Sequence, residues 1–247
     1  MFRPLAILAF ALGVALPAFA FDLTQMTDEE RASFRAEVRA YLLDNPQVIM
    51  EAVAVLEERQ AMAQAHADLS LVAENAPDIF DDGYSYVGGN PNGDITLVEF
   101  IDYRCGYCKR AHDEVAKLLA ADGNIRLIIK EFPILGDQSV LASRFAVATK
   151  QIAGPAAYKA IGDALMTQNA NVTLRSLRRM ASTLGLDTNA IEAHQNSEDV
   201  RREIAQTRAL AQRLKISGTP TFVLQDELLR GYLPFDEMLA LVNEKRG

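Results

Sequence analysis

The sequence is poor in cysteine, because its 247 residues include only Cys105 and Cys108, three positions apart. Disulfides that stabilise secreted domains usually link distant segments and so constrain the unfolded chain. A bond between these two cysteines would close almost no loop and would therefore add little stability. A stabilising disulfide framework is thus excluded, and the pair requires a chemical explanation.

Histidine is also scarce, with only three in the chain. A structural zinc site needs about four ligands. Cys105, Cys108 and His112 supply three from one segment, and the other two histidines lie far away in the sequence. Covalent haem attachment needs a histidine directly after the second cysteine, where this chain has Lys109. We therefore expect no metal site and no cofactor, and interpret His112 as a residue of a helix face.

Positive charge is not in excess, since 25 Lys and Arg face 33 Asp and Glu, for a net charge of -8. An acidic chain is repelled by phosphate backbones, so no nucleic-acid partner is expected. Hydrophobic residues make up 49% of the chain, which is enough for a packed core. No internal repeat or low-complexity tract interrupts the sequence.

Long apolar runs are missing except near the start, where residues 1–20 are typical of a signal peptide. Arg3 supplies a positive start, residues 5–16 are apolar, and Ala18-Phe19-Ala20 offers small residues for cleavage. An uncleaved anchor is the alternative, but the run is short for a bilayer span. We expect export to the periplasm, because no later segment is long and apolar enough to cross a membrane.

Residues 21–80 form a region whose residues 28–67 have helical periodicity. Asn45-Pro46 divides it, because asparagine can cap a new helix that begins with proline. The apolar stripes of the two helices consist of Phe34, Val38, Tyr41 and Leu42, and of Val48, Ile49, Val53 and Leu56. Two small amphipathic helices cannot bury such stripes alone, so they pack on the main domain or on other subunits.

Pro and Gly residues are frequent over residues 74–94, which places a domain boundary near residue 80. Residues 81–247 then read as an α/β domain. Strands at 95–101 and 125–132 flank a helix at 105–121, which makes a βαβ unit. The remaining elements are a short strand at 84–87, a helical insertion over about residues 137–214, strands at 221–224 and 228–232, and a last helix at 235–244.

Cys105 stands at the start of the predicted helix, where unpaired N–H groups and the helix dipole favour negative charge. This position lowers the pKa of a thiol and so favours the reactive thiolate. Arg104, Lys109 and Arg110 add positive charge nearby. Cys108 is one turn further on the same side, within reach of a disulfide with Cys105. It can therefore resolve a mixed disulfide that Cys105 forms with a substrate.

Two other residues support a redox site. Glu99 lies inside an apolar strand, where a carboxylate is costly unless it has a task or a partner. Buried under the helix, it could exchange protons with Cys108, whereas the alternative is that it faces solvent. Thr219-Pro220 follows Gly218 at the start of a strand and is a candidate cis peptide that exposes the Thr219 backbone to a substrate. An ordinary trans proline is the alternative.

The segments 99–110 (EFIDYRCGYCKR) and 218–222 (GTPTF) resemble the active-site segment and the cis-proline loop of the DsbA-like branch of the thioredoxin superfamily. The resemblance covers about residues 81–247 and implies a thioredoxin-like fold with a helical insertion. It also implies Cys105 as nucleophile, Cys108 as resolving thiol, Glu99 as buried acid and Pro220 as the cis-proline.

At the same site we expect Thr219, Gly106 and Tyr107 to contact the substrate. The dipeptide Gly106-Tyr107 replaces the Pro-His of familiar DsbA proteins. A histidine between the cysteines stabilises the thiolate of strong oxidants, so its absence argues against strong oxidase character.

Residues 34–60 resemble the N-terminal region of ScsC-type proteins, which are linked by name to suppression of copper sensitivity. Some of those proteins assemble through this region into trimers with disulfide isomerase activity. The resemblance implies a homo-oligomer, such as a trimer, formed through residues 28–67.

The leading hypothesis is an exported thiol–disulfide oxidoreductase, leaning toward isomerase or reductase. Its partners would be cysteine-containing exported proteins and a membrane redox partner that recharges the dithiol. A monomeric dithiol oxidase and a copper-binding dithiol protein remain as alternatives. A weaker alternative is that residues 21–80 mainly recruit a partner.

Overall fold

The computed structural model describes residues 26–247, so the signal peptide predicted at residues 1–20 lies outside the described residues. The chain forms two units, one ending at Arg59 and the other running from Gln60 to Gly247. This division comes earlier in the chain than the boundary near residue 80 expected from the sequence. The reason is that Val72 and Ile79 are buried in the same core as the strand residue Val98.

The described part of the first unit is helical. Helix α1 (Asp28–Asp44) begins with a capping box, in which the Thr27 side chain accepts the N–H of Glu30 and the Glu30 carboxylate accepts the N–H of Thr27. The predicted break at Asn45-Pro46 is confirmed, and helix α2 (Gln47–Glu74) follows it. Within residues 26–59 no side chain is buried. The exposed ones include these residues of the predicted apolar stripes: Phe34, Val38, Tyr41, Ile49, Val53 and Leu56.

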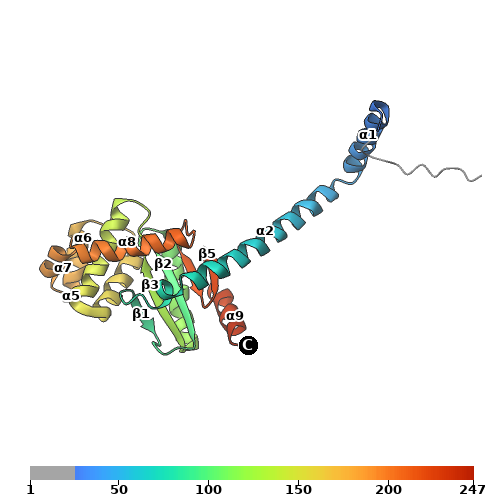
Figure 1. Ribbon diagram of the computed structural model, residues 1–247. Helices are drawn as coiled ribbons and strands as arrows, with labels where there is room; N and C mark the ends of the chain where they lie inside the picture. The colour runs from blue at the N-terminus through green and yellow to red at the C-terminus, as the bar shows by residue number, and fades with distance from the viewer. Residues whose placement is uncertain (1–25) are drawn as a thin grey trace, which may run out of the picture. The chain divides into compact units, whose positions relative to one another are not determined.

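The second unit is built on a five-stranded sheet in the order β1-β3-β2-β4-β5 (Figure 1). Its centre is the parallel pair β2 (Ile95–Ile101) and β3 (Ile125–Glu131), joined by helix α4 (Gly106–Asp122). The antiparallel strands are β1 (Tyr86–Gly89) beside β3, β4 (Thr221–Leu224) beside β2, and β5 (Glu227–Arg230) at the edge. The expected α/β class with a thioredoxin-like fold is thereby confirmed.

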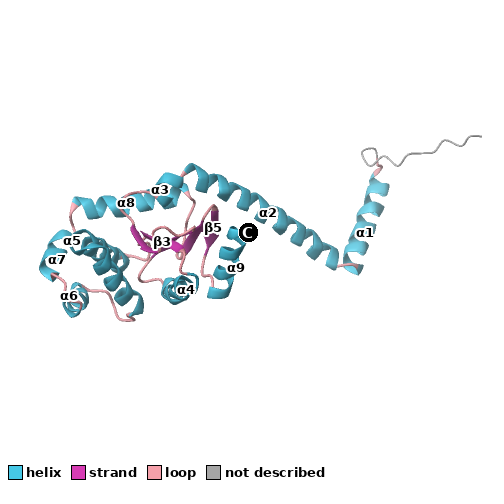
Figure 2. Cartoon of the chain, turned by 90° about the horizontal axis from the view of Figure 1, so that it is seen from below, coloured by secondary structure: helices cyan, strands magenta, loops and turns pink. Residues whose placement is uncertain are grey.

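Helices cover both faces of this sheet (Figure 2). On one face, α4 and α9 (Phe235–Arg246) pack through residues such as Val115, Leu118 and Met238. The other face is covered by α3 (Ala76–Phe80) and α8 (Glu198–Arg213), through residues such as Ile79 and Leu210. Burial of apolar side chains on both faces accounts for the nearly continuous hydrophobic run of β2.

The helical insertion lies between β3 and β4 and comprises α5 (Asp137–Thr167), α6 (Leu174–Thr183), α7 (Thr188–His194) and α8. Helix α5 is kinked where Gly154 takes a φ of 85° directly before Pro155. The insertion has its own core, which includes Phe145, Ile161 and Leu177. That core also contains Tyr103 and Cys108, so it reaches the start of α4.

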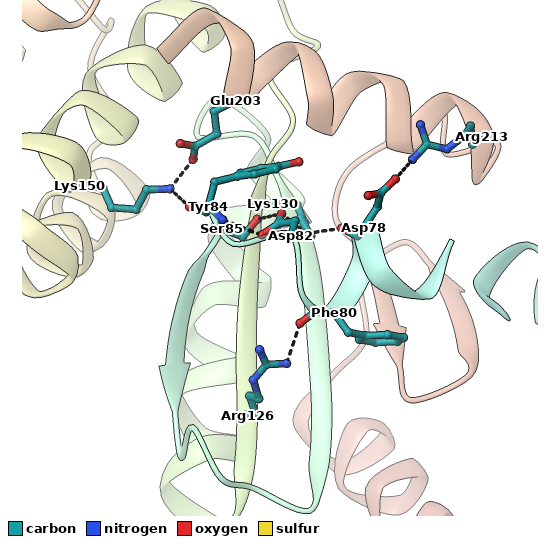
Figure 3. Close-up of polar contacts among 10 residues, drawn as sticks. All are labelled: Asp78, Phe80, Asp82, Tyr84, Ser85, Arg126, Lys130, Lys150, Glu203 and Arg213. Atoms are coloured by element: carbon teal, nitrogen blue, oxygen red, sulfur yellow. Dashed lines mark hydrogen bonds and ion pairs between the residues drawn. The ribbon is translucent and has the colours of Figure 1, made fainter. Parts of the chain in front are cut away.

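Two lysines, Lys130 and the half-buried Lys150, hold the segment between α3 and β1 against the domain (Figure 3). Lys130 of β3 is fully buried and donates to the carboxylate of Asp82 and to the backbone carbonyl of Asp78. Lys150 of α5 donates to the Tyr84 carbonyl and to the Glu203 carboxylate. A buried lysine without such acceptors would be strongly destabilising. These contacts explain why a stretch rich in Pro and Gly is packed against the sheet.

None of the helices described in residues 26–247 has both the length and the apolar character that crossing a membrane requires.

Candidate active site

The two cysteines lie at the junction between β2 and α4. Cys105 is the N-cap of α4, and its carbonyl accepts the N–H of Lys109 at 3.1 Å. Its own N–H donates to the Asp102 carbonyl at 3.0 Å, which closes the turn out of the strand. Both cysteines are free thiols in the structure. The first strand-to-helix junction thus places a dithiol at the positive end of a helix.

Cys105 is 7% exposed, and in its protonated form the thiol donates to the backbone carbonyl of Thr219 at 3.1 Å. The pKa of Cys105 is lowered to about 5, first because the Cys108 thiol hydrogen-bonds to its sulfur. The backbone N–H groups of Cys108 and Tyr107 lower this pKa further, while burial opposes the shift. At neutral pH Cys105 is therefore a thiolate.

Cys108 has the opposite character. It is completely buried, and its sulfur accepts the N–H of Asp102 at 3.5 Å. The pKa of Cys108 is raised, first by its hydrogen bond to Cys105 and then by burial, with the negative charge of Glu99 adding to the shift. Cys108 thus keeps its proton while Cys105 is ionised, which is the division of labour that an attacking and a resolving thiol require.

Glu99 lies in β2 between Ile129 of β3 and Phe222 of β4, and it is 3% exposed. The alternative that it faces solvent is therefore wrong. Its Oε1 has no hydrogen-bond partner among the described residues. Burial raises the pKa of Glu99 to about 8. This carboxyl group can thus hold or release a proton near neutral pH.

The turn before β4 completes the surface beside Cys105. The Thr219–Pro220 peptide bond is cis, and the alternative of an ordinary trans proline is therefore wrong. Thr219 is half-buried and Pro220 is buried, whereas Gly106 and Tyr107 are exposed. The Arg110 guanidinium lies over the Tyr107 ring, 4.2 Å from its centroid. The fold therefore brings together the cysteines and a turn that is more than 100 residues later in the chain.

Asp102 is a residue of this site that the sequence analysis missed. It is fully buried, and its carboxylate accepts the N–H groups of Arg104 at 2.8 Å, Ile134 at 2.8 Å and Leu135 at 3.0 Å. It thereby fastens the loop after β3 beside the start of α4. The only signal in the sequence was its place at the end of a strand, three residues before Cys105.

Glu131 is a second buried acid that the sequence analysis missed. It accepts the hydroxyl protons of Tyr103 at 2.7 Å and Tyr158 at 2.6 Å. Burial raises the pKa of Glu131 to about 7, against the lowering effect of these hydrogen bonds. Its partners come from the loop after β2 and from α5, far apart in the sequence.

The positive side chains near Cys105 are partly engaged elsewhere. Lys109 donates to the Gln168 carbonyl, and the pKa of Lys109 is lowered by burial and by the charge of Arg104. His112 contacts Asp163 through Nε2 and Oδ1 at 3.2 Å and does not join the thiols. Within residues 26–247 no three His, Cys, Asp or Glu side chains gather in a way that could hold a metal ion.

Two protein families match the chain. The family described as DSBA-like thioredoxin domain matches residues 96–243. The family described as copper resistance protein ScsC N-terminal domain matches residues 30–63.

Solved structures resemble it as well. A thioredoxin-like oxidoreductase from Silicibacter pomeroyi DSS-3 is 40% identical, with 70% of this chain and 98% of that chain covered and a TM-score of 0.66. A linker-deletion mutant of Proteus mirabilis ScsC is 25% identical, with 91% of this chain and 99% of that chain covered and a TM-score of 0.66.

Among curated relatives, a Na(+)/H(+) antiporter NhaA 3 from Salinispora tropica is 27% identical over 184 residues. That match covers 74% of this chain but only 28% of the antiporter. The chain therefore spans less than a third of the length of this relative.

Proposed function

The chain belongs to the DsbA-like thioredoxin family, and from this premise we propose that it exchanges disulfides with cysteines of exported proteins through Cys105 and Cys108. The observation that carries the proposal is the opposite character of the two thiols. The pKa of Cys105 is about 5, whereas the Cys108 thiol beside it is buried and has a raised pKa. Cys105 is thus the thiolate that attacks the substrate, and Cys108 stays protonated until it attacks Cys105.

The exchange follows from this arrangement. The Cys105 thiolate attacks one sulfur of a substrate disulfide, and the other substrate sulfur leaves as a thiolate. Cys108 then loses its proton to Glu99 and attacks Cys105, which releases the second substrate sulfur. Two electrons pass from the dithiol to the substrate, and a Cys105–Cys108 disulfide remains. The same steps in reverse oxidise a substrate dithiol.

The substrate would lie over the exposed part of the site. The Thr219 backbone, next to Pro220, can form hydrogen bonds with an extended substrate segment. Gly106 has no side chain that would block the access of this segment to Cys105. Tyr107, held by Arg110, supplies an aromatic surface for the same segment. These roles of Thr219, Pro220, Gly106 and Tyr107 are part of the proposal.

Within this activity we propose isomerase or reductase character. The absence of a histidine between the cysteines disfavours strong oxidase character. The exposed apolar stripes of α1 and of the first part of α2 give residues 28–67 a surface for assembly of copies of the chain, such as a trimer. Export through residues 1–20 to the periplasm and recharging by a membrane redox partner complete the proposal.

The test uses the chain without residues 1–20, kept reduced and mixed with a protein that carries scrambled disulfides. We expect it to restore native pairing, and Cys105→Ser to lose this activity. A Val38→Glu, Leu42→Glu double variant would weaken assembly and isomerisation together. The control Ala36→Glu adds charge to the opposite face of α1 and should leave both unchanged. If the wild-type protein only oxidises dithiols as a monomer, the oxidase alternative is correct.

Cu(I) binding is a second candidate function, supported by the copper-resistance description of the family that matches residues 30–63. Two thiolates suit this soft ion. The discriminating measurement is a Cu(I) titration of the reduced protein beside the exchange assay. Stoichiometric binding that is lost in Cys108→Ser, together with no exchange activity, would favour copper handling over redox catalysis.

A further inference from the structure

Glu99 has to exchange protons with solvent if it serves Cys108 in repeated cycles. It is almost completely enclosed, with β3 and β4 on its two sides. A small cavity lies next to it, with walls that come from β2, β3, α4 and α5. This cavity measures about 60 Å³, and Glu99 is one of its lining residues.

The cavity is large enough for water, since one water molecule needs roughly 10–15 Å³ of such space. Its polar lining gives water partners, because Glu99 Oε1 lacks a hydrogen-bond partner among the described residues. Its other walls are apolar and include Val115 of α4 and Leu127 of β3. The polar groups that water in this cavity would contact are therefore mainly side chains that can exchange protons.

His112 and Asp163 line the same cavity from α4 and α5 and are also open to solvent. Their side chains are 26% and 39% exposed, and His112 Nε2 lies 3.2 Å from Asp163 Oδ1. Lys159 also binds Asp163. Burial acts to raise the pKa of Asp163, but the hydrogen bonds from His112 and Lys159 lower it overall. Asp163 is thus an anion that orients the imidazole at the cavity.

The other titratable groups on the cavity do not offer an equivalent exit. Lys159 also lines it, but its amine binds the Asp163 carboxylate. Tyr103 and Tyr158 direct their hydroxyl protons to Glu131, and burial raises the pKa of both tyrosines. Tyr86 of β1 stacks on Tyr158, and burial raises its pKa as well. Imidazole is the side chain that most readily gains and loses a proton near neutral pH.

We propose that this cavity is a water-filled proton path between Glu99 and solvent, and that His112 is the residue that passes the proton at its outer end. The inference rests on the proposed exchange reaction. When Cys108 attacks Cys105, its thiol proton goes to Glu99, then through cavity water to His112 and out to solvent. Each transfer returns the donor to its former state, so the path is ready for the next cycle.

The test isolates the step in which Cys108 attacks. Reduced protein without residues 1–20 is mixed with a fluorescent peptide disulfide, and release of the second peptide thiol is followed in a single turnover from pH 6 to pH 9. His112→Gln keeps a hydrogen-bond donor for Asp163 but cannot carry a proton. His194→Gln is the matched control, since His194 is half-buried and lies 2.7 Å from Gln151 in a different part of the fold.

We expect His112→Gln to slow this release about tenfold near pH 7, less than the roughly 100-fold loss typical of removing a general acid or base itself. Dissolved imidazole should restore the rate, and His194→Gln should match the wild type. Added to Glu99→Gln, the His112 change should have no further effect, because both act on one path. Equal rates for both histidine variants, or no recovery with imidazole, would overturn the proton path and leave the proposed function standing. A wild-type protein without any exchange would overturn both.

Discussion

Glu99 in β2 and Glu131 in β3 are buried carboxyl groups on adjacent strands, yet their surroundings differ. The hydroxyls of Tyr103 and Tyr158 both donate to Glu131 Oε1, whereas Glu99 borders a cavity. Each group also has one buried oxygen without a hydrogen-bond partner among the described residues, Oε2 of Glu131 and Oε1 of Glu99. Burial raises the pKa of both groups, to about 7 for Glu131 and about 8 for Glu99. The difference teaches that a carboxyl held by two tyrosine hydroxyls serves packing, while one that borders a cavity near a thiol is available for proton exchange.

The largest expected effect on stability comes from removing the carboxyl group of Glu131. Glu131→Ala would leave the hydroxyls of Tyr103 and Tyr158 without their acceptor inside the core, at a cost of roughly 3 kcal/mol or more in unfolding free energy. Glu131→Gln retains an oxygen acceptor and should lose only about 1 kcal/mol. Urea unfolding of the reduced proteins measures both, and equal losses would show that the two hydrogen bonds contribute little.

The second prediction concerns removal of the ionisable carboxyl group of Glu99. Glu99→Gln should slow the attack of Cys108 about 100-fold at pH 7, because the proton of the buried thiol then lacks its acceptor. The first attack by Cys105 should keep its rate. Single-turnover kinetics separate the two steps, and Glu131→Gln is the matched control at a neighbouring buried position. A similar slowing in both variants would mean that the two acids do not differ in function.

The third prediction concerns stability against pH. The pKa of Glu99 is raised to about 8 in the folded state from 4.5, so the stability that this shift provides is complete below about pH 4.5 and is lost as the pH rises toward 8. Between pH 5 and pH 7 the wild type should lose about 2 kcal/mol relative to Glu99→Gln, which does not titrate. Unfolding curves at several pH values measure this, and parallel pH profiles would contradict the buried state of Glu99.

The smallest effect is expected when only one of the two hydrogen bonds to Glu131 is removed. Tyr158→Phe keeps the ring, which lies 4.9 Å from the Tyr86 ring, but removes one donor to Glu131. We expect a loss of about 1 kcal/mol in unfolding free energy. The pKa of Glu131 should rise further, because a bond that stabilises its charged form is lost. NMR titration of the carboxyl carbon measures the pKa, and an unchanged value would show that Tyr103 alone satisfies Glu131.

The sequence was sufficient to predict the strand-helix-strand order, the dithiol at the start of α4, the burial of Glu99 and the cis bond before Pro220. Each of these follows from a local pattern or from a resemblance carried by a short motif. The surroundings of Asp102, His112 and Glu131 could not be found in this way, because they depend on partners from other elements. Glu131 stands next to Lys130 near a strand end, where a charged pair usually indicates solvent.

The segment from residue 74 to residue 94 shows the same limit. Its Pro and Gly residues indicated a loop and a domain boundary, with a short strand at 84–87. The structure has that strand as β1, shifted to Tyr86–Gly89, and also has helix α3, which was not expected. The amines of the buried Lys130 and the half-buried Lys150 hold the chain between α3 and β1. A lysine in a strand or helix gives no sign in the sequence that it binds such a segment.

The Asp102 carboxylate holds the loop after β3 through the backbone N–H groups of Ile134 and Leu135, and both of those side chains are exposed. Any residue except proline offers the same N–H group. The hydrogen bonds to Asp102 therefore do not depend on which side chains stand at positions 134 and 135. Substitutions other than proline at positions 134 and 135 should therefore leave this loop anchored to Asp102, three residues before Cys105.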